Sequence, residues 1–214
     1  MKLSSYFRST AAYRVRIALN LKQVDYDIIP VHLVRNGGEQ KSAAYRHKNP
    51  EGLVPALEVQ GSVLSQSLAI IEYLEEVYPE PALLPSEPLL RAYVRGLAQA
   101  ITSDIHPLNN LRVLQYLVKE LDVTEQQKLA WYQHWVATGF SGLETRLATS
   151  PRTGDYCLGA TPGIADLCLV PQVYNAQRFN CDMSDYPTIS RINEACLALQ
   201  AFQQAAPEQQ VDAE

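Results

Sequence analysis

The chain has 214 residues, 47% of them hydrophobic, and a formal net charge of -5. This length and composition predict a folded protein of one or two domains with a sizeable core. The negative charge argues against nucleic acid as a partner. The N-terminus lacks the apolar segment of a secretion signal, and no apolar stretch approaches about 18 residues. We therefore expect a cytoplasmic protein with no membrane association.

The first quarter of the chain is basic although the whole is acidic. Residues 1–48 hold nine Lys or Arg against three acidic residues, a balance of +6, so the remainder carries -11. A basic segment inside an acidic protein indicates a local site for a small anion.

The cysteines and histidines do not form a metal-binding pattern. The four cysteines lie in the last third of the chain without a C-x-x-C motif, which predicts reduced packing residues. The histidines at 32, 47 and 134 have no ligand-like spacing, so we expect no metal. The cysteines are Cys157, Cys168, Cys181 and Cys196.

The first 80 residues alternate strand-like and helical segments. Ser9 and Thr10 can cap a first helix, in which apolar residues recur at helical spacing, and a later amphipathic helix begins at Ser67 and is halted by Pro79. The order β-α-β-α-β-β-α is typical of a thioredoxin-like α/β domain. The other predicted elements are strands at 2–6 and 26–32, a short helix at 42–47, and two strands that meet in a turn at Gly61.

A proline-rich linker separates this region from a second one in which strand signals almost vanish. Helices are predicted near 88–106, 124–149, 163–178 and 187–199. The sequence therefore predicts a thioredoxin-like domain at 1–84, an all-helical domain at 88–205, and a frayed polar tail at 206–214.

The turn into the first helix is where a thioredoxin-like domain carries its reactive groups, because a helix N-terminus presents free N–H groups and partial positive charge. The sequence there is Ser9-Thr10-Ala11-Ala12 instead of C-x-x-C, so the protein must borrow a thiol. Bound glutathione would supply one, with Ser9 or Thr10 donating a hydrogen bond to its sulfur. Two alternatives remain open: Ser9 only caps the helix, or Tyr6 activates the thiol.

Two further segments fit a peptide ligand. A cis Val54-Pro55 bond would direct the main-chain groups of Val54 toward it. Gln66-Ser67 opens a helix, where a hydroxyl and free N–H groups suit a carboxylate. In this order, the three segments describe a glutathione site.

Several motifs resemble those of the zeta-class glutathione transferases, the maleylacetoacetate and maleylpyruvate isomerases, and the likeness extends to about residue 200. They are S-Y-F-R-S-T-A-A-Y-R-V-R-I-A-L, G-G-E-Q, N-P-E-G-L-V-P-A-L, L-S-Q-S-L-A-I-I-E-Y-L and D-I-H-P-L-N-N. The resemblance implies the glutathione transferase fold, glutathione as cofactor, a small dianionic maleyl substrate and a homodimer.

The resemblance also implies roles for individual residues. Ser9 would activate the glutathione thiol, with Thr10 and Arg8 beside it. Arg178 would join Arg8 in binding the substrate carboxylates. Asp104 would reach glutathione across the dimer interface. The remaining glutathione-binding residues would be Gln40, Val54, Gln66, Ser67, His106 and Asn110.

The sequence departs from the family pattern at two places. Many members read S-S-C at the turn, so Ala11 excludes a mechanism that needs a protein cysteine there. Gly163 stands where Ser or Thr usually caps a central helix, which we expect to persist with Asp166 at its start. Arg14 and Arg16 are expected to be solvated or salt-bridged.

Other interpretations stay open at this point. The protein could be a general transferase that conjugates small electrophiles, or a non-enzymatic interaction protein on the same fold. A lone histidine such as His106 is more often structural, and Arg178 could simply complement a helix dipole.

Overall fold

The computed structural model describes residues 1–214, which form two compact units. The first consists of Met1–Leu83 together with Ala198–Glu214, and the second of Leu84–Leu197. None of the helices combines the length and apolar character needed to span a membrane.

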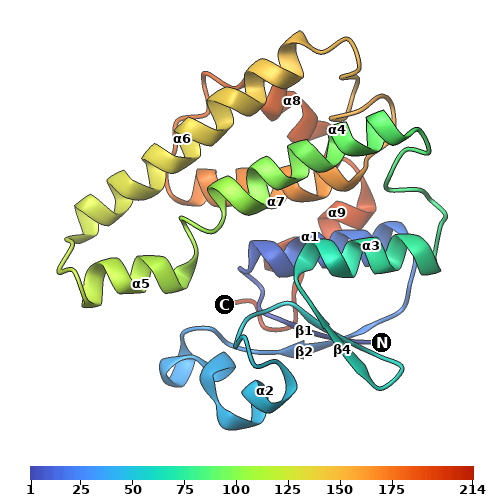
Figure 1. Cartoon of the computed structure of the whole chain (residues 1–214). Helices are drawn as coiled ribbons and strands as arrows, with labels where there is room; N and C mark the ends of the chain where they lie inside the picture. The colour runs from blue at the N-terminus through green and yellow to red at the C-terminus, as the bar shows by residue number, and fades with distance from the viewer. The chain divides into compact units, whose positions relative to one another are not determined.

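A four-stranded sheet in the order β2-β1-β3-β4 forms the centre of the first unit. β1 pairs with β2 in parallel and with β3 in antiparallel, and β3 pairs with β4 in antiparallel. Two helices, α1 and α3, cover one face of the sheet, and α2 lies on the other side (Figure 1). The predicted thioredoxin-like order is therefore confirmed. The elements are β1 (Lys2–Ser5), α1 (Thr10–Leu21), β2 (Asp27–Pro30), α2 (Ala43–Lys48), β3 (Ala56–Val59), β4 (Ser62–Ser65) and α3 (Ser67–Val77).

The turn between β3 and β4 follows from its sequence. Gln60 and Gly61 occupy the two turn positions with φ of 49° and 78°. Two-residue hairpins favour positive φ at both positions because the turn then matches the twist of the strands. The glycine adopts this conformation at no steric cost.

Helix α1 is buried on almost every side, which corrects one expectation. Arg14 and Arg16 are 1% and 0% exposed, so neither side chain is solvated, which was the first of the two alternatives that the sequence suggested. The physical reason is that α1 packs against both α3 and α9 (Gln200–Ala205), as well as lying on the sheet. The face of α1 that looks polar in the sequence is therefore covered by a segment almost 200 residues away.

The C-terminal segment corrects a second expectation, that residues 206–214 fray. A 3₁₀ turn at Pro207–Gln209 follows α9. The side chain of Gln210 is buried, and its Nε2 donates to the carbonyl oxygens of Gln204 at 3.0 Å and Ala206 at 2.8 Å. Polar residues order this tail because they satisfy main-chain groups, and the tail belongs with α9 to the first unit.

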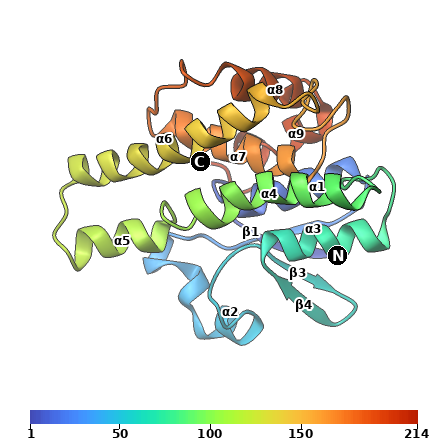
Figure 2. The ribbon, with the colours of Figure 1, turned by 45° about the horizontal axis from the view of Figure 1, so that its top comes forward.

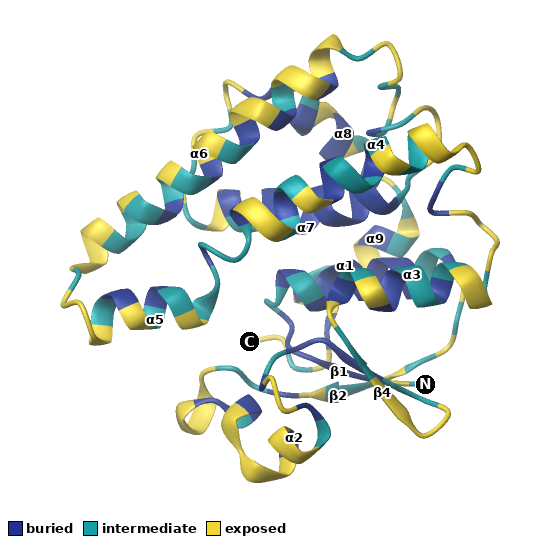
Figure 3. Cartoon of the chain, viewed as in Figure 1, coloured by how far each residue is buried: buried dark blue, intermediate teal, exposed yellow.

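The second unit is entirely helical and is built around α7. Eleven of the fifteen residues of α7 are buried, and the helix packs against α4 and α8 (Figures 2 and 3). The helix predicted near 88–106 is present as α4 and a π-helical segment, Ala100–Ile105, that extends it, whereas α5 was not predicted. The helices are α4 (Pro88–Gln99), α5 (Leu111–Lys119), α6 (Glu125–Thr149), α7 (Ile164–Arg178) and α8 (Pro187–Leu197).

Helix α7 begins as expected despite its glycine cap. Asp166 Oδ2 accepts from the Gly163 N–H at 2.8 Å, and Oδ1 accepts from the Cys157 N–H at 2.8 Å. Burial raises the pKa of Asp166, although the N–H groups that it accepts from oppose this shift. The carboxylate therefore replaces the missing side-chain cap.

Candidate active site

Four chain segments leave the sheet of the first unit at the same edge. Ser5, the last residue of β1, pairs with Pro30 at the end of β2. Ala56, the first residue of β3, pairs with both Ser4 and Ser65. The segments that carry Arg8 to Thr10, Gln40, Val54 and Gln66 therefore all start from this edge, as the thioredoxin-like interpretation requires.

Ser9 lies at the N-terminus of α1, at the turn between β1 and the helix. Its Oγ accepts from the Ala12 N–H at 3.2 Å, and its own N–H donates to the Tyr6 carbonyl oxygen at 2.9 Å. A hydroxyl that accepts a hydrogen bond still carries one O–H to donate. Ser9 can therefore cap the helix and activate a thiol at the same time. Thr10, the next residue, is 3% exposed.

The Tyr6 side chain belongs to the core of this edge. Its ring makes edge contacts with the rings of Phe7 and His32, at centroid distances of 4.8 and 4.9 Å. Tyr6 and Phe7 share a buried cluster with Val54, against which Leu33 packs. This cluster joins the turn before Ser9 to the Val54 segment and to the loop that contains Gln40.

The Val54 segment is held in place by the residue before it. The carbonyl oxygen of Leu53 accepts from Tyr45 Oη at 2.7 Å and from Asn49 Nδ2 at 2.9 Å. Burial raises the pKa of Tyr45 to about 12, so its hydroxyl stays protonated as a donor at neutral pH. The predicted cis Val54-Pro55 bond is confirmed. No hydrogen bond within the chain uses the N–H or C=O of Val54, so both can bind a peptide ligand.

Gln40 presents an unused acceptor. Its side chain is 7% exposed, its Nε2 donates to the Leu33 carbonyl oxygen at 3.3 Å, and its Oε1 is buried without a partner. A buried polar atom without a hydrogen bond costs about 1–3 kcal/mol, which a ligand N–H would recover. Gly38 makes this placement possible, because a Cβ there would lie 2.7 Å from the Gln40 amide.

The N-terminus of α3 combines free N–H groups with a buried cation. Arg14 Nη1 donates to Ser67 Oγ at 3.3 Å. Gln66 precedes the helix with φ of 67°, a left-handed conformation that non-glycine residues adopt rarely, and its Nε2 donates to Glu51 Oε2 at 3.0 Å. A helix N-terminus backed by an arginine suits a carboxylate. Sequence reasoning missed Arg14 and Glu51 here, although an arginine within an apolar helix was a usable signal.

Arg8 has a charge that the chain itself leaves unpaired. Its guanidinium carbon lies 4.6 Å from the centre of the Phe7 ring, and no carboxylate forms an ion pair with it. A half-buried arginine stacked on an aromatic ring is well suited to bind an external carboxylate.

The remaining predicted site residues belong to the second unit. Asp104 is exposed in the π-helical segment, which His106 follows directly. Asn110 caps α5, its Oδ1 accepting from the Arg112 N–H at 3.1 Å. Arg178 is exposed in the last turn of α7, with its guanidinium carbon 5.0 Å from the centre of the Phe179 ring.

A thioredoxin-like unit with serine in place of the reactive cysteines, followed in the chain by a helical unit, is the architecture of a glutathione transferase. Residues 8–77 match the family model of the glutathione S-transferase N-terminal domain. No set of His, Cys, Asp and Glu side chains in the structure is arranged to hold a metal ion.

Full-length relatives identify the family. The chain is 53% identical to the probable maleylacetoacetate isomerase of Vibrio cholerae, over 99% of this chain and 97% of the relative. A solved maleyl pyruvate isomerase, described as a bacterial zeta-class transferase, matches with a TM-score of 0.97, 47% identity and complete coverage of both chains. Another, the maleylacetoacetate isomerase of Methylobacterium extorquens with bound malonate and glutathione, matches at 40% identity and a TM-score of 0.96, again covering both chains completely. The chain therefore belongs to the zeta-class glutathione transferases, and the resemblance predicted from its motifs is confirmed.

Proposed function

We propose that this protein is a glutathione-dependent cis-trans isomerase that converts a maleyl dicarboxylate, maleylacetoacetate or maleylpyruvate, to its fumaryl isomer. The observation that carries the proposal is the unpaired guanidinium of Arg8, the residue that precedes Ser9 at the start of α1. A cation for an anionic substrate and a hydroxyl for a thiol thus come from consecutive residues. The names of the full-length relatives support the same reaction.

The residues of the first unit fit glutathione. Gln40 offers a buried acceptor, Val54 a free N–H and C=O, and the Gln66-Ser67 helix start a place for a carboxylate. These groups match the amides and the γ-glutamyl end of the tripeptide. Bound glutathione supplies a thiolate that adds reversibly to the cis double bond, so that the former double bond can rotate before the thiol leaves.

Ser9 supports the thiolate. A thiol pKa near 8.5 leaves only about 3% thiolate at pH 7, and lowering it by about two units requires roughly 2.7 kcal/mol. A hydrogen bond to the charged sulfur contributes about 1.5–3 kcal/mol, and the helix N-terminus adds about 0.3–1 kcal/mol. Ser9 is better suited than Thr10 because its side chain is half-buried, whereas Thr10 is buried.

Arg8 and Arg178 bind the two carboxylates of the substrate. Each guanidinium can hold one carboxylate through two parallel hydrogen bonds, which orients the double bond as well as attracting it. Neither arginine forms an ion pair within the chain, and each lies beside an aromatic ring of its own unit. Arg178 could instead serve only as a cation at the C-terminus of α7, and the mutant comparison in the Discussion separates these roles.

The second unit contributes further contacts to glutathione through His106 and Asn110. Asp104, whose side chain is exposed, reaches the glutathione of a second copy in a homodimer. A cytoplasmic location is consistent with four cysteines that form no disulfide.

An assay with and without glutathione tests the proposal. The purified protein should bind glutathione-agarose and isomerise maleylpyruvate or maleylacetoacetate only when glutathione is present. A general transferase would conjugate a neutral electrophile efficiently but isomerise poorly, and a non-enzymatic protein would do neither. Either result would overturn the proposed function.

A further inference from the structure

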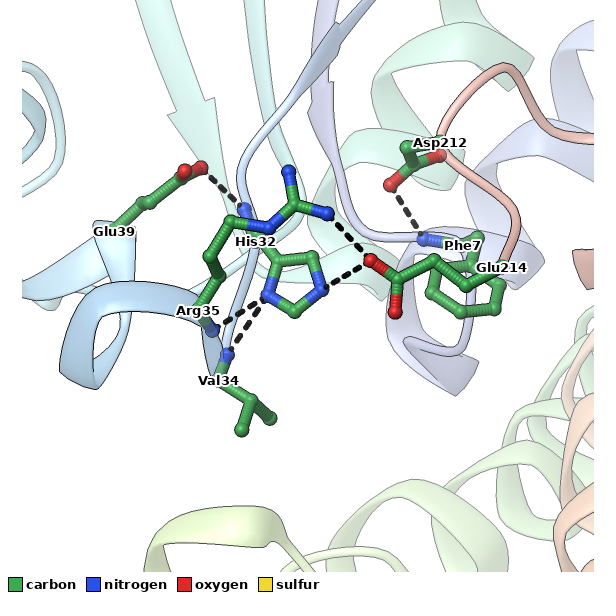
Figure 4. A network of polar contacts seen from close by, with 7 residues as sticks. All are labelled: Phe7, His32, Val34, Arg35, Glu39, Asp212 and Glu214. Carbon is green, nitrogen blue, oxygen red and sulfur yellow. Dashed lines mark hydrogen bonds and ion pairs between the residues drawn. The ribbon is translucent and has the colours of Figure 1, made fainter.

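The C-terminal tail reaches the residue before Arg8 (Figure 4). The N–H of Phe7 donates to Asp212 Oδ2 at 3.1 Å. The carbonyl oxygen of Phe7 accepts from Arg16 Nη2 at 3.0 Å. Both main-chain polar groups of Phe7 are therefore held by side chains from other parts of the first unit.

Arg16 holds the rest of this turn as well. Its Nη1 donates to Ser5 Oγ at 3.0 Å and to the Tyr6 carbonyl oxygen at 3.4 Å, and its Nε donates to the Ala205 carbonyl oxygen at 3.0 Å. The same Tyr6 oxygen accepts from the Ser9 N–H at 2.9 Å. One buried guanidinium thus links the end of β1, the turn and α9. Burial lowers the pKa of Arg16 to about 10, so it remains charged at neutral pH.

The tail is fixed on both sides of Asp212. Before it, Gln210 is buried and bonded to two carbonyl oxygens of the α9 segment. After it, Glu214 Oε1 lies 2.5 Å from Arg35 Nη2 and 3.4 Å from His32 Nε2 (Figure 4). His32 in turn accepts from the Val34 and Arg35 N–H groups through Nδ1. Asp212 is therefore presented to Phe7 by an ordered segment.

We propose that Arg16 and Asp212 are positioning residues, which fix the main chain of Phe7 and thereby orient the Arg8 guanidinium and the Ser9 hydroxyl. The inference rests on the proposed function, because that function gives Arg8 and Ser9 their roles. Catalytic groups must be held within about 0.5 Å of their productive geometry. A displacement of about 1 Å can cost a hundredfold in rate. The tail thus acts on the reaction without touching the substrate.

Asp212 allows the sharper test because its side chain is only partly buried, so its replacement should leave the fold intact. Asp212→Ala removes the acceptor of the Phe7 N–H, whereas Asp212→Asn keeps a carbonyl oxygen there. We expect Asp212→Ala to raise the apparent thiol pKa of bound glutathione by about one unit, from about 6.5 to about 7.5, which lowers the thiolate fraction at pH 7 about threefold. Together with the displacement of Arg8, this should lower kcat about tenfold at pH 7. The KM for glutathione should change less than about twofold, and Asp212→Asn should restore most of the activity.

Asp25→Ala is the matched control, because it removes an equal charge from an exposed position of the same unit. It should leave kcat and the titration unchanged. The positioning role of Asp212 is wrong if Asp212→Ala keeps wild-type kcat and titration, or if the two alanine variants behave alike.

Arg16→Lys keeps the positive charge but loses the several N–H donors of the guanidinium group. It should lower kcat at least as far as Asp212→Ala does. If Arg16→Lys keeps the wild-type kcat, the positioning role of Arg16 is wrong.

A measurement without ligand separates this inference from the proposed function. In the free protein, hydrogen exchange of the Phe7 amide, followed by NMR, should be at least about tenfold faster in Asp212→Ala than in wild type. An unchanged exchange rate contradicts the positioning of Phe7 by Asp212, even if the protein is an isomerase. Absence of isomerase activity in the wild type overturns the proposed function whatever the exchange rates show.

Discussion

Two helix starts, those of α1 and α7, use side-chain caps in different ways. At α7, both oxygens of the fully buried Asp166 accept from main-chain N–H groups of its own unit. At α1, the half-buried Ser9 accepts from Ala12 and keeps its O–H available. A cap whose hydrogen bonds are all used inside the protein contributes stability. A cap with a donor left over at a surface can also take part in chemistry.

The largest effect on stability is expected from replacing Asp166, the buried cap of α7. Asp166→Ala leaves the buried N–H of Cys157 and the partly buried N–H of Gly163 without acceptors, which should reduce the free energy of unfolding by about 3 kcal/mol. Chemical denaturation monitored by circular dichroism measures this loss. Asp166→Asn keeps one carbonyl oxygen and should lose less.

Glu87→Ala is the matched control for this prediction. Glu87 also caps a helix through two N–H groups, those of Leu89 and Leu90, but it is exposed. Water can replace its carboxylate, so the loss should be at most about 1 kcal/mol. Equal losses in Asp166→Ala and Glu87→Ala would contradict the importance of burial.

The next largest effect, on activity, is expected at the proposed substrate-binding arginines, Arg8 and Arg178. Arg8→Ala and Arg178→Ala should each lower kcat/KM on the maleyl dicarboxylate by roughly thirtyfold or more, because loss of one partner of a buried charge pair costs about 2–5 kcal/mol. Conjugation of a neutral electrophile should fall much less. If Arg178→Ala reduces both activities equally, or neither, Arg178 only complements the dipole of α7.

The smallest effect is expected at the first position of the α7 cap. Gly163→Ser adds a hydroxyl of the kind that favours a helix N-cap, but Asp166 already binds the Gly163 N–H. The free energy of unfolding should change by only a few tenths of a kcal/mol. A change above about 1 kcal/mol in the same denaturation experiment would show that Asp166 alone caps the helix poorly.

The sequence predicted what depends on local pattern. The spacing of apolar residues, and the glycines and prolines that end helices and strands, predicted the order of the elements in the first unit. The S-T-A-A turn, Val54-Pro55 and Gln66-Ser67 marked three segments that the structure brings to one edge of the sheet. The burial of Arg14 and Arg16 could not be predicted in this way. For Arg16 it depends on α9, which returns to α1 from the far end of the chain, and for Arg14 on the start of α3, where its Nη1 donates to Ser67 Oγ.

The prediction that residues 206–214 fray was wrong, because a polar C-terminal segment is usually solvated and disordered. Here Gln210 and Asp212 use their polar groups on main-chain partners of the first unit. These hydrogen bonds depend on how distant parts of the chain are arranged in space, which the composition of the tail does not indicate. The roles of Arg178, Asp104, His106 and Asn110 remain predictions that rest on family resemblance.

The comparison of the two caps is tested most directly by titrating the thiolate absorbance of bound glutathione in wild type and Ser9→Ala. Loss of the remaining O–H donor should raise the thiol pKa by about one to two units and lower turnover at neutral pH. Ala11→Cys, which adds a cysteine to the turn, should leave the titration unchanged. An unchanged titration in Ser9→Ala would contradict the account and move the activating role to Thr10 or Tyr6.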